Sequence, residues 1–302
     1  MDAHDSVSSG VVREADASSR PKRRMIPFLK MHGAGNDFVV IDHRRRFLVE
    51  DTLEAWVARI CDRRRGIGAD GVLLLESDPD LDFAMRYFNA DGRPAEYCGN
   101  GARCLALLAF DLGLGSGGTV RFRTSAGVQS ARPGPDRRGI ELHFGAVTQA
   151  PEPCAVEVDG QSFEGCLITA GVPHFVTPVE RVEWVPVGEW GSALRHHPRF
   201  GAAGANVDFV ARLNHGRIAM RTYERGVEAE TLACGSGAIA CALWAASRGE
   251  ASPVSVVTAG GDELVVAFRA TPGGHDVSLI GPAEVAFRGE WGEVPRLDAT
   301  RA

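Results

Sequence analysis

The chain has 302 residues, a length that favours two lobes of roughly 100–200 residues each. Its net charge of −6 excludes the broad basic surface with which proteins bind nucleic acid or anionic membranes. No apolar run reaches the roughly 20 residues of a membrane-spanning helix, and no signal-peptide core is recognisable. The seven cysteines lack metal-ligand spacing, so we expect reduced thiols in a soluble, cytoplasmic protein that acts on a small polar molecule.

Periodic patterning begins after residue 24. Residues 1–24 lack periodicity, so we expect a disordered tail, with Met25 as an alternative start of the chain. The first half then predicts a helix at 52–63, a second helix at 102–112, and strands at 38–41, 72–75, 83–88, 120–123, 128–132 and 140–144. The basic runs at 44–46 and 63–65 are short and interrupted, which is typical of solvated faces.

The second half repeats this general order after two prolines, Pro151 and Pro153, which interrupt the pattern. It predicts helices at 187–195 and 238–247, a hairpin at 207–223, and strands at 163–169, 174–179, 254–257, 264–268, 277–280 and 283–287. We therefore expect an N-terminal lobe at 25–148 and a C-terminal lobe at 149–282. The last strand, about 283–290, has two possible places, in the second lobe or back in the first.

The helices at 102–112 and 238–247 lack a wide polar face. A helix that is apolar nearly all round must be buried, which favours a central helix wrapped by strands in each lobe. The predicted fold class is α/β with α+β character. Two pseudo-symmetric lobes each place a mixed, largely antiparallel sheet around a buried helix.

Both of these helices are preceded by a similar segment, Cys-Gly-Asn-Gly-Ala from Cys98 and Cys-Gly-Ser-Gly-Ala from Cys234. The first turn of a helix offers unpaired backbone N–H groups and the positive end of the helix dipole, which favour a thiolate or a bound carboxylate. The other cysteines have no such setting, and we interpret them as small buried apolar residues. They are Cys61, Cys104, Cys154, Cys166 and Cys241.

Two thiols on opposite sides of one carbon are suited to inverting a stereocentre, because one removes a proton and the other delivers a proton to the opposite face. Such a pair must start as one thiolate and one thiol. The charge that develops on the substrate needs strong stabilisation, which backbone N–H groups at two helix starts provide to an α-carboxylate. The residues that offer these groups are Gly99, Asn100, Gly235 and Ser236. No lysine motif for pyridoxal phosphate is evident, so we expect inversion without a cofactor.

Several further motifs accompany the two cysteine segments in order along residues 26–290. They are Met-His-Gly-Ala-Gly-Asn-Asp-Phe at 31–38, Gly-Ile-Gly-Ala-Asp-Gly at 66–71, Phe-Asn-Ala-Asp-Gly at 88–92, Pro-His-Phe at 173–175, Asn-Val-Asp-Phe at 206–209 and Tyr-Glu-Arg-Gly at 223–226. In this combination the chain resembles the diaminopimelate epimerase family, whose members convert LL- to meso-diaminopimelate without pyridoxal phosphate.

The resemblance implies that Cys98 and Cys234 are the catalytic acid/base thiols. Residues implied to bind the substrate are Asn36, Asn89, Gly99, Asn100, Asn206, Glu224, Arg225, Gly235 and Ser236. His174 and Glu224 are implied to tune the pKa values of the two cysteines. The resemblance further implies no cofactor, no metal, a homodimer, and a role in lysine and peptidoglycan precursor synthesis.

The chain departs from the family pattern in the residues around the substrate. Val172 stands where many members have asparagine before Pro-His, and Gly71 stands where the family has glutamine. The link between Arg225 and Cys234 is one residue longer than its commonest form. Two alternatives therefore stay open, a related racemase of another amino acid such as glutamate and a thiol redox sensor or binding protein.

Overall fold

A computed structural model describes residues 25–95, 97–135 and 139–292. The tail predicted at residues 1–24 lies outside the described residues, and the alternative start, Met25, is the first residue described. The chain forms two units. The first comprises residues 1–27 and 290–302, of which only the outer ends of the first and last strands are described. The second unit, residues 28–289, contains all the described helices and the candidate site.

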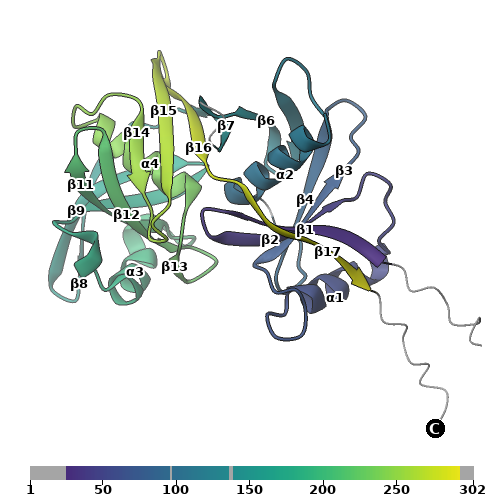
Figure 1. Cartoon of the computed structure of the whole chain (residues 1–302). Coiled ribbons are helices and arrows are strands. Elements are labelled where there is room, and N and C mark those ends of the chain that lie inside the picture. Colours follow the sequence, from purple (N-terminus) through teal and green to yellow (C-terminus); the bar gives the residue numbers. More distant parts are fainter. Residues whose placement is uncertain (1–24, 96, 136–138, 293–302) are drawn as a thin grey trace, which may run out of the picture. The chain divides into compact units, whose positions relative to one another are not determined.

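The first half of the chain surrounds one long helix with strands (Figure 1). Its elements are β1 (Met25–Gly33), β2 (Asn36–Asp42), α1 (Glu50–Cys61), β3 (Gly71–Glu76), β4 (Phe83–Asn89), α2 (Gly99–Asp111), β5 (Val120–Thr124), β6 (Gly127–Pro133) and β7 (Ile140–Val147). The pairs β2–β3 and β4–β5 are parallel, while β1–β2, β3–β4, β5–β6 and β6–β7 are antiparallel. Mixed pairing is what the sequence predicted for this half.

Helix α2 is buried because its residues are small or apolar on nearly every side. Leu105 packs in one apolar cluster with Phe38 of β2, Leu73 of β3 and Phe122 of β5, all of them fully buried. Burial of each such side chain stabilises the fold by roughly 1.5–3 kcal/mol. This core holds the start of α2 in one place.

The second half contains one more helix of this kind. Its elements are β8 (Glu152–Val158), β9 (Gln161–Ala170), β10 (Val172–Pro178), α3 (Val187–Arg195), β11 (Asn206–Asn214), β12 (Arg217–Glu224), β13 (Ala229–Thr231), α4 (Gly235–Ala246), β14 (Val254–Val257), β15 (Glu263–Thr271), β16 (Gly274–Gly281) and β17 (Glu284–Gly292), with short 3₁₀ turns η3 (Val182–Trp184) and η4 (Pro198–Phe200). Parallel pairing occurs at β10–β11 and β12–β14.

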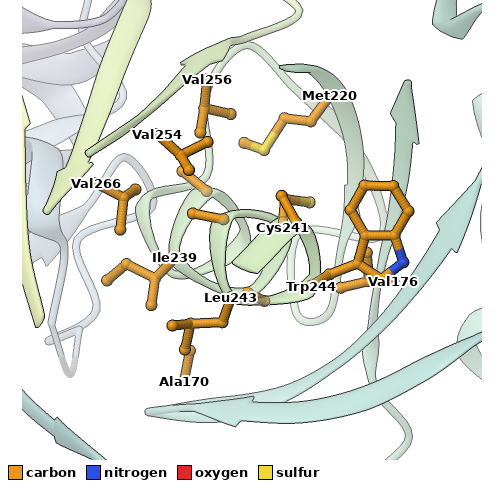
Figure 2. Packing of buried hydrophobic residues seen from close by; sticks show 14 of the residues in the cluster. Ala170, Val176, Met220, Ile239, Cys241, Leu243, Trp244, Val254, Val256 and Val266 are labelled. Atoms are coloured by element: carbon orange, nitrogen blue, oxygen red, sulfur yellow. The ribbon is translucent and has the colours of Figure 1, made fainter. Parts of the chain in front are cut away.

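Figure 2 shows α4 within its apolar surroundings. Leu243 projects from the helix towards Ala170 of β9, and Trp244 projects towards Val176 of β10. Val256 and Val266 lie on another side of the helix in the same apolar cluster. The predicted α/β fold class, with a buried helix surrounded by mixed strands in each half, is confirmed. Antiparallel pairing of β16 with β7 connects the sheets of the two halves.

The structure contains three strands that the sequence analysis did not predict, β1, β8 and β13. Pro153 lies in β8, whose pairing partner in the described part of the chain is β9 alone. A proline that lacks an N–H donor is tolerated on such an edge strand, so this residue did not mark a loop. Phe287 of β17 packs edge-on against Phe28 of β1, with ring centroids 6.1 Å apart, so the last strand lies beside the first.

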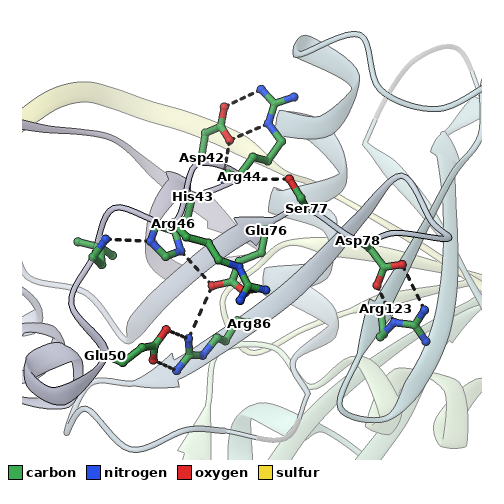
Figure 3. Close-up of polar contacts among 11 residues, drawn as sticks. Asp42, His43, Arg44, Arg46, Glu50, Glu76, Ser77, Asp78, Arg86 and Arg123 are labelled. Atoms are coloured by element: carbon green, nitrogen blue, oxygen red, sulfur yellow. Dashed lines mark hydrogen bonds and ion pairs between the residues drawn. The ribbon is translucent and has the colours of Figure 1, made fainter.

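Three of the six arginines in the two basic runs, Arg44, Arg46 and Arg63, have ion pairs with nearby carboxylates. Figure 3 shows Arg44 paired with Asp42 at 2.7 Å and the buried His43 in contact with Glu76 at 2.9 Å. Arg46 is largely exposed and lies 3.4 Å from Glu76. None of the residues of the run at 44–46 lines the large cavity at the starts of α2 and α4, which agrees with the prediction of a solvated face for this run.

Candidate active site

The two cysteines of the repeated segments occupy equivalent positions. Cys98 and Cys234 both have extended backbone conformations and immediately precede α2 and α4. Their carbonyl oxygens accept the first helical hydrogen bonds, at 2.8 Å from Ala102 and 2.9 Å from Ala238. Neither helix start has a capping side-chain hydrogen bond, so the N–H groups of both first turns are available to a ligand.

Both helix starts open into one cavity of about 1210 Å³. Every predicted catalytic or substrate-binding residue lines it: Asn36, Asn89, Cys98, Gly99, Asn100, Asn206, Glu224, Arg225, Cys234, Gly235 and Ser236. The Asn100 side chain donates a hydrogen bond of 3.2 Å to the carbonyl of Ala233, the residue before the second cysteine. This bond connects the two helix starts directly.

Cys98 is half-buried beside amide groups. Its thiol donates to Oδ1 of Asn36 at 3.4 Å, and Nδ2 of Asn36 donates to Asp70 at 2.7 Å, which fixes the orientation of the amide. Burial raises the pKa of Cys98 above its ordinary value. The N–H groups of Gly101 and Asn100 oppose that shift because they stabilise a thiolate.

Cys234 is buried and lies 3.5 Å from the hydroxyl of Ser236. Burial, followed by the negative charges of Glu224 and Asp208, raises the pKa of Cys234 well above its ordinary value. Burial also raises the pKa of Glu224, while hydrogen bonds from Thr231 and Cys234 lower it. The thiol and the carboxyl group therefore affect each other's pKa across the same cavity.

His174 does not line the cavity and lies one layer behind it, fully buried. Its Nδ1 contacts Asp208 at 2.7 Å and its Nε2 contacts Nδ2 of Asn206 at 3.3 Å. The N–H of Arg225 donates to Oδ1 of Asn206 at 2.7 Å, so the amide nitrogen of Asn206 faces the imidazole. His174 Nε2 must then accept that bond, and Nδ1 is the donor to Asp208.

Arg63 belongs to a basic run that the sequence analysis interpreted as a solvated face, and its side chain is 58% exposed, in agreement with that interpretation. The sequence analysis gave Arg63 no functional role. The side chain lines the cavity and contacts Asp37 at 2.6 Å and Asp70 at 2.7 Å. Through Asp70 it supports the orientation of Asn36. The signal available in the sequence was Asp70 in the Gly-Ile-Gly-Ala-Asp motif, to which no role was given.

The two departures from the family pattern differ in their structural consequences. Val172 lines the cavity, so an apolar side chain faces the space where an amide was expected. Gly71 does not line it, and a Cβ there would lie 2.3 Å from the carbonyl oxygen of Phe88. The backbone at Gly71 therefore leaves no room for a side chain.

No group of three or more histidine, cysteine or carboxylate side chains in the described parts of the chain is arranged to hold a metal ion. Among the same residues, no helix is long and apolar enough to cross a membrane. The polar groups that face the cavity are amides, thiols, carboxyl groups, guanidinium groups and backbone N–H groups. Together they suit a small molecule that carries both carboxylate and ammonium groups.

Comparison with known proteins gives consistent matches in sequence and in fold. The family model described as diaminopimelate epimerase matches residues 28–148 and 166–284. A diaminopimelate epimerase from Aquifex aeolicus is 42% identical over 276 residues, covering 88% of this chain and 98% of the relative. One from Methanocella arvoryzae is 36% identical over 275 residues, covering 88% and 96%.

Solved structures with low sequence identity share the fold. A phenazine biosynthesis protein of the PhzF family from Bacillus anthracis aligns with a TM-score of 0.66 at 14% identity, covering 89% of this chain and 99% of that one. A hydroxyproline epimerase from Agrobacterium vitis, with bound trans-4-hydroxy-L-proline, aligns with a TM-score of 0.62 at 18% identity, covering 90% and 93%.

Proposed function

Since the chain belongs to the diaminopimelate epimerase family, we propose that it converts LL-2,6-diaminopimelate to meso-diaminopimelate by inverting one α-carbon. Cys98 and Cys234 are the acid and the base of this reaction. The observation that carries the proposal is that both cysteines precede buried helices and line the same cavity. No cofactor takes part in the proposed reaction.

The reacting α-carboxylate binds at the two helix starts. The backbone N–H groups of Gly99, Asn100, Gly235 and Ser236 stabilise its charge, and this stabilisation increases as the Cα–H bond breaks and electron density moves onto the carboxylate. A Cβ atom added at Gly99 would have no neighbouring atom within 4 Å, so the space beside this residue is open to a ligand. Glycine at this position lets a carboxylate approach the backbone closely.

The proton transfers balance across the two thiols. One cysteine, as thiolate, takes the α-proton and becomes a thiol, while the other, as thiol, gives its proton to the opposite face and becomes a thiolate. The α-carbon is thereby inverted and no electron leaves the substrate. Glu224, which lines the same cavity as Cys234, orients the substrate's amino group and raises the pKa of that thiol.

The distal end of the substrate binds to the remaining cavity residues. Arg225 binds the distal carboxylate through its planar guanidinium group, and Asn89 and Asn206 supply amide contacts. His174 acts through Asn206, whose amide it holds, and through its hydrogen bond to Asp208, whose negative charge raises the pKa of Cys234. Residues 25–148 and 149–282 form the two lobes that contribute the helix starts.

The chemistry also motivates a proposal about the cellular setting. The reaction requires Cys98 and Cys234 as free thiols, and all seven cysteines are free in the structure. We therefore place the protein in the reducing cytoplasm, as a homodimer that serves lysine and peptidoglycan precursor synthesis.

The proposal is tested by incubating the protein in deuterium oxide with LL-diaminopimelate or, separately, with L-glutamate, followed by chiral chromatography and mass spectrometry. We expect meso-diaminopimelate with deuterium at the inverted carbon and unchanged glutamate. Racemisation of glutamate alone would assign the chain to a related racemase, an outcome for which Val172 in the cavity gives a structural reason. Inversion of neither compound, with a reversible Cys98–Cys234 disulfide, would identify a thiol sensor.

A further inference from the structure

The two cysteine segments correspond residue for residue, but they differ in charge five positions after the cysteine. Arg103 occupies this position in α2, and Ile239 occupies it in α4. Both side chains are fully buried. A guanidinium group in the interior is costly unless its charge serves an interaction there, so this difference calls for a functional explanation.

The Arg103 side chain turns back towards the start of its own helix. Its Nη2 donates to Oδ1 of Asn100 at 2.8 Å, and its Nε donates to the carbonyl of Pro282 at 3.1 Å. Among the described residues it forms no ion pair with a carboxylate, and Nη1 has no hydrogen-bond partner there. The positive charge is therefore directed at the helix start that carries Cys98.

The surroundings of Cys234 have the opposite sign. Glu224 lines the same cavity as the thiol and raises its pKa, and Asp208 lies against the first turn of α4, where a Cβ at Gly237 would be 2.5 Å from Asp208 Oδ1. Asp208 is fully buried and accepts hydrogen bonds from His174 and Thr222, each at 2.7 Å. These bonds give each oxygen of the carboxyl group a hydrogen-bond donor.

We propose that Arg103 is a positioning residue which makes Cys98 the first of the two thiols to ionise, while Asp208 and Glu224 keep Cys234 protonated. The resting enzyme then uses Cys98 as the base and Cys234 as the acid. This inference rests on the proposed function only for the roles of base and acid. The order of ionisation is a property of the free protein.

The proposal explains how the enzyme resets after each turnover. Inversion that starts from the resting form leaves Cys98 as a thiol and Cys234 as a thiolate. In this product state the negative charge has left the helix start near the Arg103 guanidinium group and lies near the carboxyl groups of Asp208 and Glu224. The product state is therefore less stable than the resting state. Loss of a proton from Cys98 to solvent and uptake of one at Cys234 restore the resting form.

The charged groups near Cys98 act in both directions, whereas those near Cys234 all oppose its ionisation. Around Cys98 the other groups are Glu224, which opposes ionisation, and the weakly acidic side chains of Tyr87, Tyr97 and Cys104. Around Cys234 they are Glu224, Asp208 and Cys241. The positive charge of Arg103 lowers the pKa of Cys98, whereas no cation opposes the stronger upward shift at Cys234.

The test is alkylation with iodoacetamide between pH 6.5 and 10.5, with the label at each cysteine quantified by mass spectrometry of peptides. The pH at which each labelling rate is half-maximal is compared, because the absolute rates also depend on exposure. We expect Cys98 to reach this point at lower pH than Cys234. In Arg103→Met, labelling of Cys98 at pH 8 should fall about tenfold if its pKa rises by one unit, with Cys234 unchanged.

Matched variants separate charge from packing. Arg103→Lys retains the charge and should retain most of the Cys98 reactivity, and Ile239→Met changes the equivalent position of α4 without a change in charge. The proposal is overturned if Cys234 ionises at lower pH than Cys98 in the unmodified protein. It is also overturned if Arg103→Met leaves the pH dependence of Cys98 labelling unchanged. If Arg103→Met does not fold, the order in the unmodified protein and the Arg103→Lys profile decide.

An epimerase assay on the same samples distinguishes this inference from the proposed function. Early ionisation of Cys98 without inversion of diaminopimelate would leave the inference in place and overturn the function. Inversion of diaminopimelate with Cys234 ionising first would do the reverse.

Discussion

Replacement of Asp208 by asparagine tests whether the buried network behind the cavity depends on a negative charge. The carboxylate is fully buried and accepts two hydrogen bonds of 2.7 Å, from His174 Nδ1 and from the Thr222 hydroxyl. An asparagine has nearly the same shape, but its NH₂ group must face one of these donors. The substitution therefore changes charge and hydrogen bonding with little change in volume.

The expected loss of stability comes from these two bonds. A hydrogen bond to a charged group contributes about 1.5–3 kcal/mol, and a buried donor left without an acceptor costs about 1–3 kcal/mol. Because the asparagine oxygen keeps one partner, we expect Asp208→Asn to lower the free energy of unfolding by about 2–4 kcal/mol. For a chain of this size the melting temperature should fall by roughly 3–7 °C.

Thermal unfolding followed by circular dichroism measures the effect, with Asp80→Asn as the matched control. Asp80 is exposed and its contact with Arg123 is 3.5 Å long, so this control should change stability by less than about 0.5 kcal/mol. The same substitution at 208 removes a charge that raises the pKa of Cys234, so the alkaline limb of kcat/KM should move to lower pH. Unchanged stability together with an unchanged alkaline limb would show that neither the hydrogen bonds of Asp208 nor its effect on Cys234 is as described.

Three further predictions concern the cavity and its pH dependence. Val172→Asn should lower KM for diaminopimelate two- to tenfold without changing kcat, because one neutral hydrogen bond contributes about 0.5–1.5 kcal/mol; an unchanged KM contradicts this. Gly237→Ala should destabilise the protein by about 1–3 kcal/mol in denaturant unfolding, because its Cβ meets Asp208 at 2.5 Å, whereas Gly99→Ala should keep stability and lose substrate binding. Equal stability losses would refute that contrast. Since burial raises the pKa of Cys98 above 9.0, kcat/KM should rise with pH between 7 and 9, and a flat profile would contradict the thiolate as base.

The sequence predicted the parts of this molecule that depend on local pattern. The apolar stretches after Cys98 and Cys234 indicated buried helices, and the glycines beside the cysteines indicated exposed backbone at their starts, because both features lie within a few consecutive residues. The strand β8 was missed because Pro153 breaks the local pattern while its position at the edge of the sheet makes it harmless. Edge position is a property of the sheet and is not encoded near the proline.

Contacts between residues that are distant in the sequence were harder to predict. His174 and Asn206 lie opposite each other on the parallel strands β10 and β11, so their contact depends on a register that no short motif specifies. Arg63 looked like any surface arginine, although Asp37 and Asp70 hold it at the cavity. From the sequence, glycine at position 71 was a departure from the glutamine of the family. In the structure the nearby carbonyl of Phe88 leaves no room for any side chain there.

The location of deuterium early in the reaction tests the central claim most directly, namely that two different thiols serve the two faces of one carbon. LL-diaminopimelate is incubated with the protein in deuterium oxide, and the reaction is stopped below about 5% conversion. Substrate and product are separated, and the deuterium content of each is measured by mass spectrometry. The account predicts one deuterium in nearly every molecule of meso product and none in the recovered substrate. The Cys98→Ala and Cys234→Ala variants should form no meso product. Product that retains the original proton, or inversion that persists without one of the two cysteines, would contradict it.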